Sequence, residues 1–511
     1  RLVFVYHSRP CLPLFHCQGS IMRAATLLAV ITLTALAACS RTSPEQKFVN
    51  DAAAAMGGAD RILTITGIVI EGEGTQYNLG QDLSPDTIGQ TFNLTDYRRL
   101  IDLANGRART YQTRTPNFAH WAGPASRHQV QGIDGSIGYD MLPDGTTARV
   151  PQPEAADRRT ELFHHPLAAV RAALDPAAIR TNLRMEGREI LLDVVSEDQA
   201  FTLAVDADTV LPTRVMTHTY NVMLGDVIVT TTFDGYQEVD GLQLPSQLTS
   251  RTDEFPTVEI RVTSQKTGDV TEDLTAPAAI ASAPAVAGSP SVNVTAEELA
   301  RGVWYLAGQS HHSVLVEFDD HALLIEAPQH DARTLAVIAK ARELLPDKPL
   351  TQLINTHHHF DHSRGIRAAI AEGLTIITHA GNAEFFHRVA QRPHTIVQDR
   401  LSQAPQLARI EPVSNEMTIT DGRMTVVLYP VTSVHSETML MAYLPRERLL
   451  VEADLYVPGR SVMPFAAKFL DDVKALNLRI DRVVSLHGTV VSYAQFEKDS
   501  LAAAATASHG P

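Results

Sequence analysis

Imidazole and carboxylate side chains are concentrated in one short segment of the C-terminal half, Thr356-His357-His358-His359-Phe360-Asp361-His362. His357 and His359 alternate along the chain, so both can point to one cation, and Asp361 and His362 can point to a second. An apolar, strand-like run precedes the segment and a helical pattern follows it, so both ends of the loop are held. This pattern predicts a site for two metal ions. The alternatives are a solvated histidine-rich loop and a site for one metal ion.

Three further polar residues each follow an apolar, strand-like run, and they appear in a fixed order along the chain: His435, Asp454 and His487. Together with the first segment, they resemble the His-x-His-x-Asp-His signature and the later ligands of the metallo-β-lactamase superfamily. The resemblance covers about residues 303–493. It implies a hydrolase whose metal site binds two zinc ions, or other divalent metals.

The resemblance also implies a role for each residue. His357, His359 and His435 would hold the first metal, and Asp361, His362 and His487 the second, with Asp454 bridging both. A hydroxide shared by the two metals would attack the substrate, and Asp361 would be catalytic because it orients that nucleophile. Metal pairs of this kind lower the pKa of a bound water to about 7.

The chain departs from the family pattern in two places. Ala453 stands where the family often has glycine, and Glu326-Ala327-Pro328 stands in place of an Asp-Thr-Gly-like turn. The three cysteines, Cys11, Cys17 and Cys39, all lie in the first forty residues, so no thiolate ligand is available downstream. This leaves substrates of the ester, lactone, thioester, sulfate ester or β-lactam type.

A second set of polar residues flanks the predicted metal site. His311 and His312 precede a strand-like run and could contact the substrate, although a structural role is the alternative. Tyr456 follows Asp454 closely and could donate a hydrogen bond to the substrate, with core packing as the alternative. We therefore predict a small-molecule substrate that contacts His311, His312 and Tyr456.

Strand pairs mixed with helices over residues 295–500 predict an α/β fold, a layered αββα sandwich of the metallo-β-lactamase type. Residues 275–294 are rich in alanine, proline and serine and predict a linker. Before the linker, residues 44–274 alternate apolar and polar positions in many short runs, which predicts a mainly antiparallel β N-terminal domain. This domain loosely resembles the half-barrel of periplasmic lipoprotein carriers. It would provide a groove for a substrate or acyl chain, or serve as a spacer.

The beginning of the chain has the features of a processing signal. Arg23 is followed by an uncharged apolar run that ends in Leu36-Ala37-Ala38-Cys39, which resembles a bacterial lipoprotein signal. We predict a signal peptide over residues 22–38, lipidation at Cys39 and an outer-membrane anchor facing the periplasm. An ordinary secretory signal is the alternative. Residues 1–21 are interpreted as a non-native upstream extension.

The net charge of −15 disfavours a nucleic-acid partner, because an acidic surface repels phosphate backbones. The leading interpretation is therefore a lipid-anchored zinc hydrolase of the cell envelope. The alternative from another class is a non-catalytic binding or carrier lipoprotein whose N-terminal domain does the work. A nuclease of the same superfamily is disfavoured by the charge, and a flavodiiron-like oxidoreductase would need an additional flavin domain.

Overall fold

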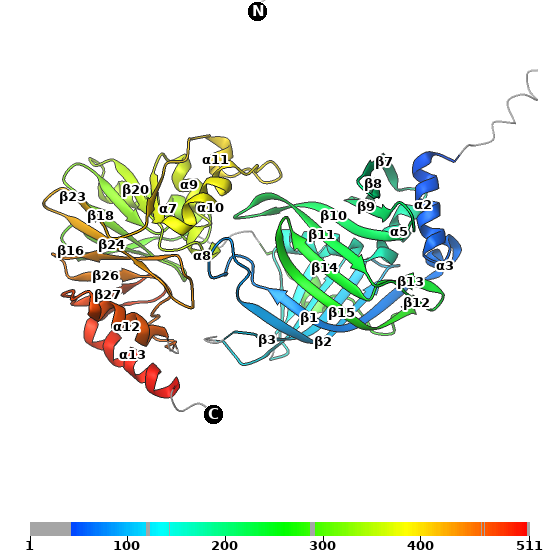
Figure 1. Ribbon diagram of the computed structural model, residues 1–511, viewed down its shortest axis with the longest axis horizontal. Helices are drawn as coiled ribbons and strands as arrows, with labels where there is room; N and C mark the ends of the chain where they lie inside the picture. The colour runs from blue at the N-terminus through cyan, green and yellow to red at the C-terminus, as the bar shows by residue number, and fades with distance from the viewer. Residues whose placement is uncertain are drawn as a thin grey trace, which may run out of the picture.

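The computed structural model describes residues 42–507, except residues 119–122, 143, 287–291, 461 and 464. The predicted upstream extension, the signal peptide and Cys39 lie outside the described residues. Two bodies lie side by side in Figure 1: the N-terminal domain, coloured blue to green, and the C-terminal domain, coloured yellow-green to red. Among the described helices, none combines the length and the apolar character needed to cross a membrane.

The N-terminal domain is built on one antiparallel sheet of 13 strands, which confirms the prediction of a mainly antiparallel β domain. The strand order is β6-β5-β4-β3-β2-β1-β15-β14-β11-β10-β9-β8-β7, so most neighbours in space are also neighbours along the chain. The strands are β1 Gly67–Tyr77, β2 Thr91–Asp102, β3 Arg107–Pro116, β4 Arg127–Asp134, β5 Ile137–Met141, β6 Thr147–Arg149, β7 Ile179–Glu186, β8 Glu189–Ser196, β9 Gln199–Asp206, β10 Pro212–Asn221, β11 Gly225–Asp234, β14 Gln247–Thr252 and β15 Phe255–Gly268, with the separate hairpin β12 Gln237–Val239 and β13 Leu242–Leu244. The half-barrel resemblance stays a prediction.

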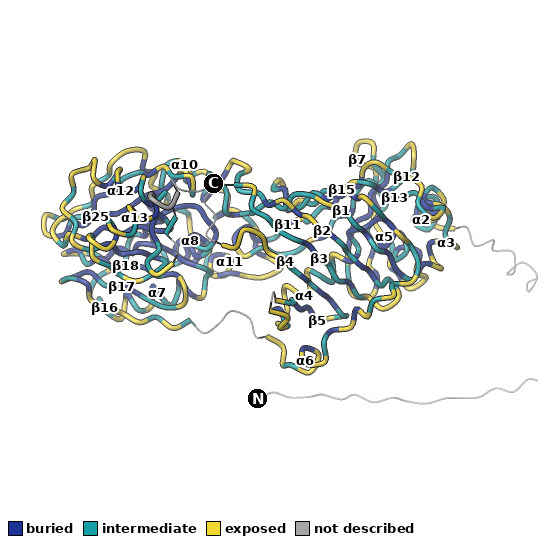
Figure 2. The backbone as a smooth tube through the Cα atoms, turned by 90° about the horizontal axis from the view of Figure 1, so that it is seen from below, coloured by how far each residue is buried: buried dark blue, intermediate teal, exposed yellow. Residues whose placement is uncertain are grey.

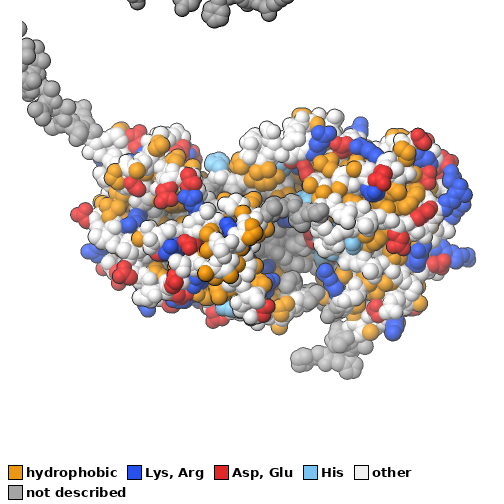
Figure 3. All heavy atoms as spheres, turned by 180° about the vertical axis from the view of Figure 1, so that it is seen from behind, with side chains coloured by type: hydrophobic (Ala, Val, Ile, Leu, Met, Phe, Trp, Pro, Cys, Tyr) orange, Lys and Arg blue, Asp and Glu red, His pale blue; other side chains and the backbone are white. Residues whose placement is uncertain are grey.

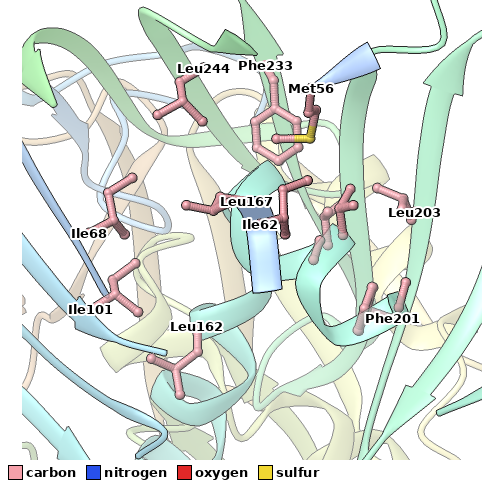
Figure 4. Packing of buried hydrophobic residues seen from close by; sticks show 14 of the residues in the cluster. Met56, Ile62, Ile68, Ile101, Leu162, Leu167, Phe201, Leu203, Phe233 and Leu244 are labelled. Atoms are coloured by element: carbon pink, nitrogen blue, oxygen red, sulfur yellow. The ribbon is translucent and has the colours of Figure 1, made fainter. Parts of the chain in front are cut away.

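Short helices pack on this sheet: α2 Pro44–Ala55, α3 Ala59–Thr64, α4 Gln152–Thr160, the 3₁₀ helix η1 Glu161–Phe163 and α5 Pro166–Leu174. Helix α5 is largely apolar and mostly buried. Figure 4 shows Leu167 of α5 among Ile62, Ile68 and Phe233, which belong to the same buried cluster. Burial of this apolar surface is the main stabilising contribution in the domain.

The first part of the predicted linker contains a short helix and packs on the N-terminal domain. Ala276 and Ile280 are buried against Tyr139 of β5, and the short helix α6 Ala278–Ala281 lies within this segment. Apolar residues of the linker therefore pack on the N-terminal domain. Residues 287–291 of the linker lie outside the described residues.

The C-terminal domain consists of two sheets with helices on their outer faces, which confirms the predicted αββα sandwich. The strand orders are β16-β17-β18-β19-β20-β21-β22 and β23-β24-β25-β26-β27-β28. One core cluster joins the first sheet to α7, α9 and α10, a second lies between the sheets, and a third joins the second sheet to α12 and α13. The elements are β16 Thr295–Ala300, β17 Val303–Ala307, β18 Ser313–Glu317, β19 Ala322–Ile325, α7 Asp331–Leu344, β20 Leu350–Ile354, α8 Phe360–Ser363, α9 Ile366–Ala371, β21 Thr375–His379, α10 Ala380–Gln391, α11 Arg400–Gln403, β22 Ile410–Val413, β23 Met417–Thr420, β24 Thr425–Val431, β25 Met439–Leu444, β26 Leu449–Glu452, α12 Phe465–Ala475, β27 Arg482–Ser485, β28 Val490–Ser492 and α13 Tyr493–Ala507.

Three of the described loops of the N-terminal domain contact the C-terminal domain. Met223 and Leu224, between β10 and β11, join the core cluster of α7, α9 and α10. Asp253, between β14 and β15, forms an ion pair with Arg392. The third loop, residues 78–90 between β1 and β2, reaches toward α8 in Figure 1. Over the face drawn in Figure 3, acidic and basic side chains are interspersed, so the charge on that face is of mixed sign.

Candidate metal centre

The predicted ligands lie at one end of the two sheets of the C-terminal domain. Strand β20 is parallel to β19, and β27 is parallel to β26, so the carboxyl ends of these strands point in the same direction within each sheet. The His357–His362 segment follows β20, Asp454 follows β26, and His487 follows β27. Helix α8, which begins in that segment, lies on the side of the domain that faces the N-terminal domain (Figures 1 and 2).

Among the described residues, eight side chains form two groups that could each hold a metal ion. Within each group, one potential ligand atom of every residue lies within 4.8 Å of those of the others. The first group contains His357, His359, His435 and Asp454, and the second contains His311, Asp361, His362 and His487. The structure thus brings together all seven residues that the resemblance implied, in the two expected sets, and adds His311.

Asp454 lies between the two groups. Its Oδ2 atom is 3.0 Å from His435 Nε2 and 3.1 Å from His362 Nε2. Its Oδ1 atom is 3.1 Å from His487 Nε2. One carboxylate therefore contacts imidazoles of both groups, which is the position that a bridging ligand requires.

Hydrogen bonds on the outer side fix the orientation of the imidazole rings. His357 Nδ1 lies 3.1 Å from Thr356 Oγ1, and His362 Nδ1 lies 3.0 Å from Glu326 Oε2. His359 uses the opposite nitrogen, since its Nε2 lies 2.9 Å from the backbone oxygen of Asp82. Each ring consequently directs its other nitrogen into the centre, as metal-ligating histidines do.

The donor set fits divalent cations. His359 Nδ1 is buried and has no hydrogen-bond partner among the described residues, an arrangement that is costly unless a ligand binds there. Burial lowers the pKa of His357 to about 3, and burial together with the neighbouring imidazoles holds the pKa of His359 far below its usual value. Both rings are therefore neutral, which is the form that binds metal.

The carboxylates of the centre are ionised. Burial opposes their ionisation, but the adjacent His362 imidazole and its neighbours outweigh it and hold the pKa of Asp361 and of Asp454 well below the usual range. Conversely, burial alone would lower the pKa of His362, but the carboxylates of Asp454 and Asp361 raise it well above its usual value. Negative charge at the centre therefore attracts positive charge, whether a proton or a metal ion.

A strained turn places Asp454. Its φ of 65° is left-handed, which is unusual for a residue other than glycine. The carboxylate of the buried Glu452 accepts hydrogen bonds from the backbone nitrogens of Leu455 and Tyr456, both at 3.1 Å. Ala453, which replaces the glycine common in the family, is accommodated at 1% exposure.

Glu326 replaces the aspartate of the family turn. It is fully buried and has a φ of 85°. Its carboxylate accepts hydrogen bonds from Thr356 Oγ1 and from Asn355 Nδ2, in addition to its contact with His362. Glu326 therefore supports the loop that carries the first ligands.

Two residues that were predicted to contact the substrate have other partners in the structure. Tyr456 is 1% exposed, packs on Phe496 and donates its hydroxyl hydrogen bond to Asp499 at 2.8 Å, so it belongs to the core. His312 accepts a hydrogen bond from the Gly308 backbone nitrogen and lies against the Tyr305 ring, outside both metal groups. Only His311, the remaining member of this set, reaches the centre.

Comparison with known proteins agrees with this geometry. Residues 306–464 match the family model of the metallo-beta-lactamase superfamily. No curated protein matches the chain.

Three of the similar solved structures are metallo-beta-lactamases. The enzyme from Pontibacter korlensis is 16% identical, with 42% of this chain and 99% of that chain covered and a TM-score of 0.33. The FIM-1 enzyme from Pseudomonas aeruginosa is 16% identical, with 43% and 98% covered and a TM-score of 0.33. The enzyme from Hirschia baltica is 18% identical, with 41% and 97% covered and a TM-score of 0.32. From the family match, the sandwich and its clustered histidines and aspartates, the C-terminal part of this chain is a metallo-beta-lactamase superfamily domain.

Proposed function

We propose that the protein is a hydrolase that uses two divalent metal ions, zinc in the first instance. The substrates would be of the ester, lactone, thioester, sulfate ester or β-lactam type. The observation that carries the proposal is the pair of four-residue groups that share contacts with Asp454. When bound, such a metal pair activates a water and polarises the oxygen of the electrophilic group.

The protein's own residues would position the reactants. Asp361 is the most accessible of the ligand side chains in the centre, with 34% exposure, so water and substrate can reach it. Its carboxylate can accept a hydrogen bond from the attacking water and so orient that water toward the electrophilic centre. His311 Nε2 lies 3.2 Å from Asp361 Oδ2 and would keep that carboxylate in place.

A paired set of variants tests this proposal. The full chain, loaded with zinc, would be assayed on an ester, a lactone, a thioester, a sulfate ester and a β-lactam. His359→Ala removes a ligand of the first group and is expected to lower the zinc content to about one ion per chain and the activity by at least about 100-fold. His321→Ala is the matched control, because His321 lies in the β18–β19 turn and pairs with Asp320. Full activity of His359→Ala without metal would refute the proposal.

The binding-protein alternative is supported by a specific feature of the N-terminal domain. A cavity of about 460 Å³ is lined by residues of its sheet and of the segment 154–165. Tyr97, Arg99 and His164 are among the lining residues. A carrier would use this cavity and would not need metal. A protein that binds apolar ligands equally well with and without zinc, and that hydrolyses none of the five substrates, would favour this alternative.

We also propose that the mature protein is anchored in the cell envelope by lipid at Cys39. The support is the Leu36-Ala37-Ala38-Cys39 sequence after an apolar run. Mass spectrometry of the N-terminal peptide from the native protein tests this directly. A mature N-terminus at a lipid-modified Cys39 is expected, and an unmodified Cys39 would exclude the anchor.

A further inference from the structure

A loop of the N-terminal domain extends to the metal centre. Residues 78–90 connect β1 to β2, and three consecutive residues of this loop contact the segment of the first ligands. The Gly80 oxygen accepts a hydrogen bond from the Phe360 backbone nitrogen at 3.0 Å. Gln81 Nε2 donates to Asp361 Oδ1 at 2.7 Å, and the Asp82 oxygen is the partner of His359. One residue in each metal group is thus held by the N-terminal domain.

The same loop is also attached to the loop that carries His435. The Leu83 oxygen accepts hydrogen bonds from the Glu437 backbone nitrogen at 2.7 Å and from Ser436 Oγ at 3.3 Å. Gly80 allows the close approach, because its φ is 81° and a Cβ atom there would lie 2.3 Å from the Phe360 ring. The loop is therefore a fixed wall of the site and not a loose connection.

A cavity of about 760 Å³ lies between this wall and the C-terminal domain, within the usual size range of small-molecule sites. Its lining is mainly apolar and comes from both domains. Leu83, Gly89, Gln90 and Phe118 belong to the N-terminal domain, and Val431, Val434, Leu455, Phe465 and Phe469 are prominent on the C-terminal side.

The cavity adjoins the metal centre. Leu83 follows Asp82, Val434 precedes His435, and Leu455 follows Asp454, so three lining residues are chain neighbours of groups in or against the centre. The Phe465 ring, which also lines the cavity, lies 6.1 Å from the His435 ring. A substrate whose reacting group lies at the metals would extend its remaining part into this cavity.

The charges of the lining disfavour an anionic substrate. The charged side chains among the lining residues are Glu437, Lys468 and Asp472. Lys468 is already paired with Asp472, which leaves the negative charge of Glu437 uncompensated within the lining. A carboxylate, sulfate or phosphate on the substrate would be repelled and would lose its hydration, whereas a neutral apolar group would be stabilised by burial.

We propose that the cavity between the loop of residues 78–90 and the C-terminal domain binds the hydrocarbon chain of a neutral acyl ester or lactone, and that Leu83 limits the length of that chain. This inference rests on the proposed hydrolase function and names the substrate class of the same site. The N-terminal domain is then part of the substrate site.

The test compares p-nitrophenyl esters from acetate to dodecanoate on the zinc-loaded full chain. Each buried methylene is expected to raise kcat/KM about fourfold until the cavity is full, and octanoate to exceed acetate by at least about 30-fold. Leu83→Trp fills the cavity and is expected to lower the octanoate-to-acetate ratio at least about tenfold. Gly80→Ala displaces the loop and should lower the same ratio.

Gly106→Ala is the matched control. Gly106 also has a positive φ, 63°, but a Cβ atom there has nothing within 4 Å, so the variant has comparable backbone strain without touching the site. Its ratio should equal that of the wild type. A ratio near one in the wild type, or an unchanged ratio in both Leu83→Trp and Gly80→Ala, would overturn the inference while ester hydrolysis itself stands.

Binding of the neutral dye N-phenyl-1-naphthylamine gives a second measurement that needs neither metal nor turnover. Leu83→Trp should weaken dye binding at least about fivefold, and Gly106→Ala should leave it unchanged. Loss of dye binding in Leu83→Trp from a protein that hydrolyses none of the five substrate types would support the cavity and overturn the proposed hydrolase function. Equal dye binding by both variants and the wild type would overturn the cavity.

Discussion

Replacing Glu326 with glutamine should weaken zinc binding about 10- to 100-fold, because this buried carboxylate orients a ligand ring without itself belonging to either metal group. Glu326 Oε2 accepts from Thr356 Oγ1 and lies 3.0 Å from His362 Nδ1. Its Oε1 atom accepts from Asn355 Nδ2 at 3.2 Å. The variant keeps the size of the side chain and removes its charge.

The magnitude follows from these contacts. An amide has one accepting oxygen and one donating NH₂ group, so one end of the substituted side chain would face donors that it cannot satisfy. If that end faces Thr356 and His362, two charge-assisted hydrogen bonds are lost, at about 1.5–3 kcal/mol each. The free energy of unfolding of the C-terminal domain should therefore fall by about 3 kcal/mol or more.

Isothermal titration calorimetry with zinc and urea denaturation of the metal-free protein measure the two effects. Glu317→Gln is the control. Glu317 lies at the opposite end of the β18–β19 pair from Glu326, where it forms an ion pair with Lys348, and this variant should cost less than about 1 kcal/mol. If Glu326→Gln binds zinc as tightly as the wild type does, the assigned role of Glu326 is wrong.

Three further predictions concern stability. Arg367 is 3% exposed and paired with Asp399, so Arg367→Met should cost about 3–5 kcal/mol in urea denaturation; a loss below about 1 kcal/mol would contradict this. Burial lowers the pKa of His164 and of His165 to about 4, below the value of 6.5 for an exposed histidine. The stability that they contribute is therefore complete above about pH 6.5 and is lost toward pH 4, by about 1.4 kcal/mol per pH unit for each histidine. A double His→Asn variant should show a correspondingly smaller loss between pH 7 and pH 5, and an unchanged loss would refute it. Chelation of zinc should lower Tm by about 5–10 °C in thermal scans, and an equal Tm with and without chelator would argue against a bound metal.

The central ligands could be predicted from the sequence because their signal is local. The His357–His362 segment combines ligand types at short spacing, and His435, Asp454 and His487 follow recognisable strands. The sandwich was predictable for a related reason, since its strands are short apolar runs alternating with helical patterns. The match over residues 306–464 agrees with that part of the prediction.

What the sequence could not predict depends on contacts between distant segments. Gln81 and Asp361 are 280 positions apart, and no pattern in residues 78–90 indicates that this loop reaches the metal centre. His311 has no distinctive spacing, so its place in the second metal group appears only in three dimensions.

The burial of His164 and His165 likewise depends on a local break between two helices. A single helix over this segment would place His164 and His165 within it, but η1 ends at Phe163 and Pro166 begins α5. Proline favours the first turn of a helix, which lacks internal acceptors for its N–H groups, so a new helix begins there. The break turns both histidines inward, and they are buried beside polar partners, His164 with Thr217 and Thr231.

The most direct test of the central claim is the metal content of the full chain after zinc loading and gel filtration, measured by inductively coupled plasma mass spectrometry. Two groups of four ligands predict about two zinc ions per chain, falling to about one in Asp361→Ala, which removes a ligand of the second group only. Preparations that retain less than about 0.2 zinc ions per chain, or that retain two after the loss of Asp361, would contradict the account.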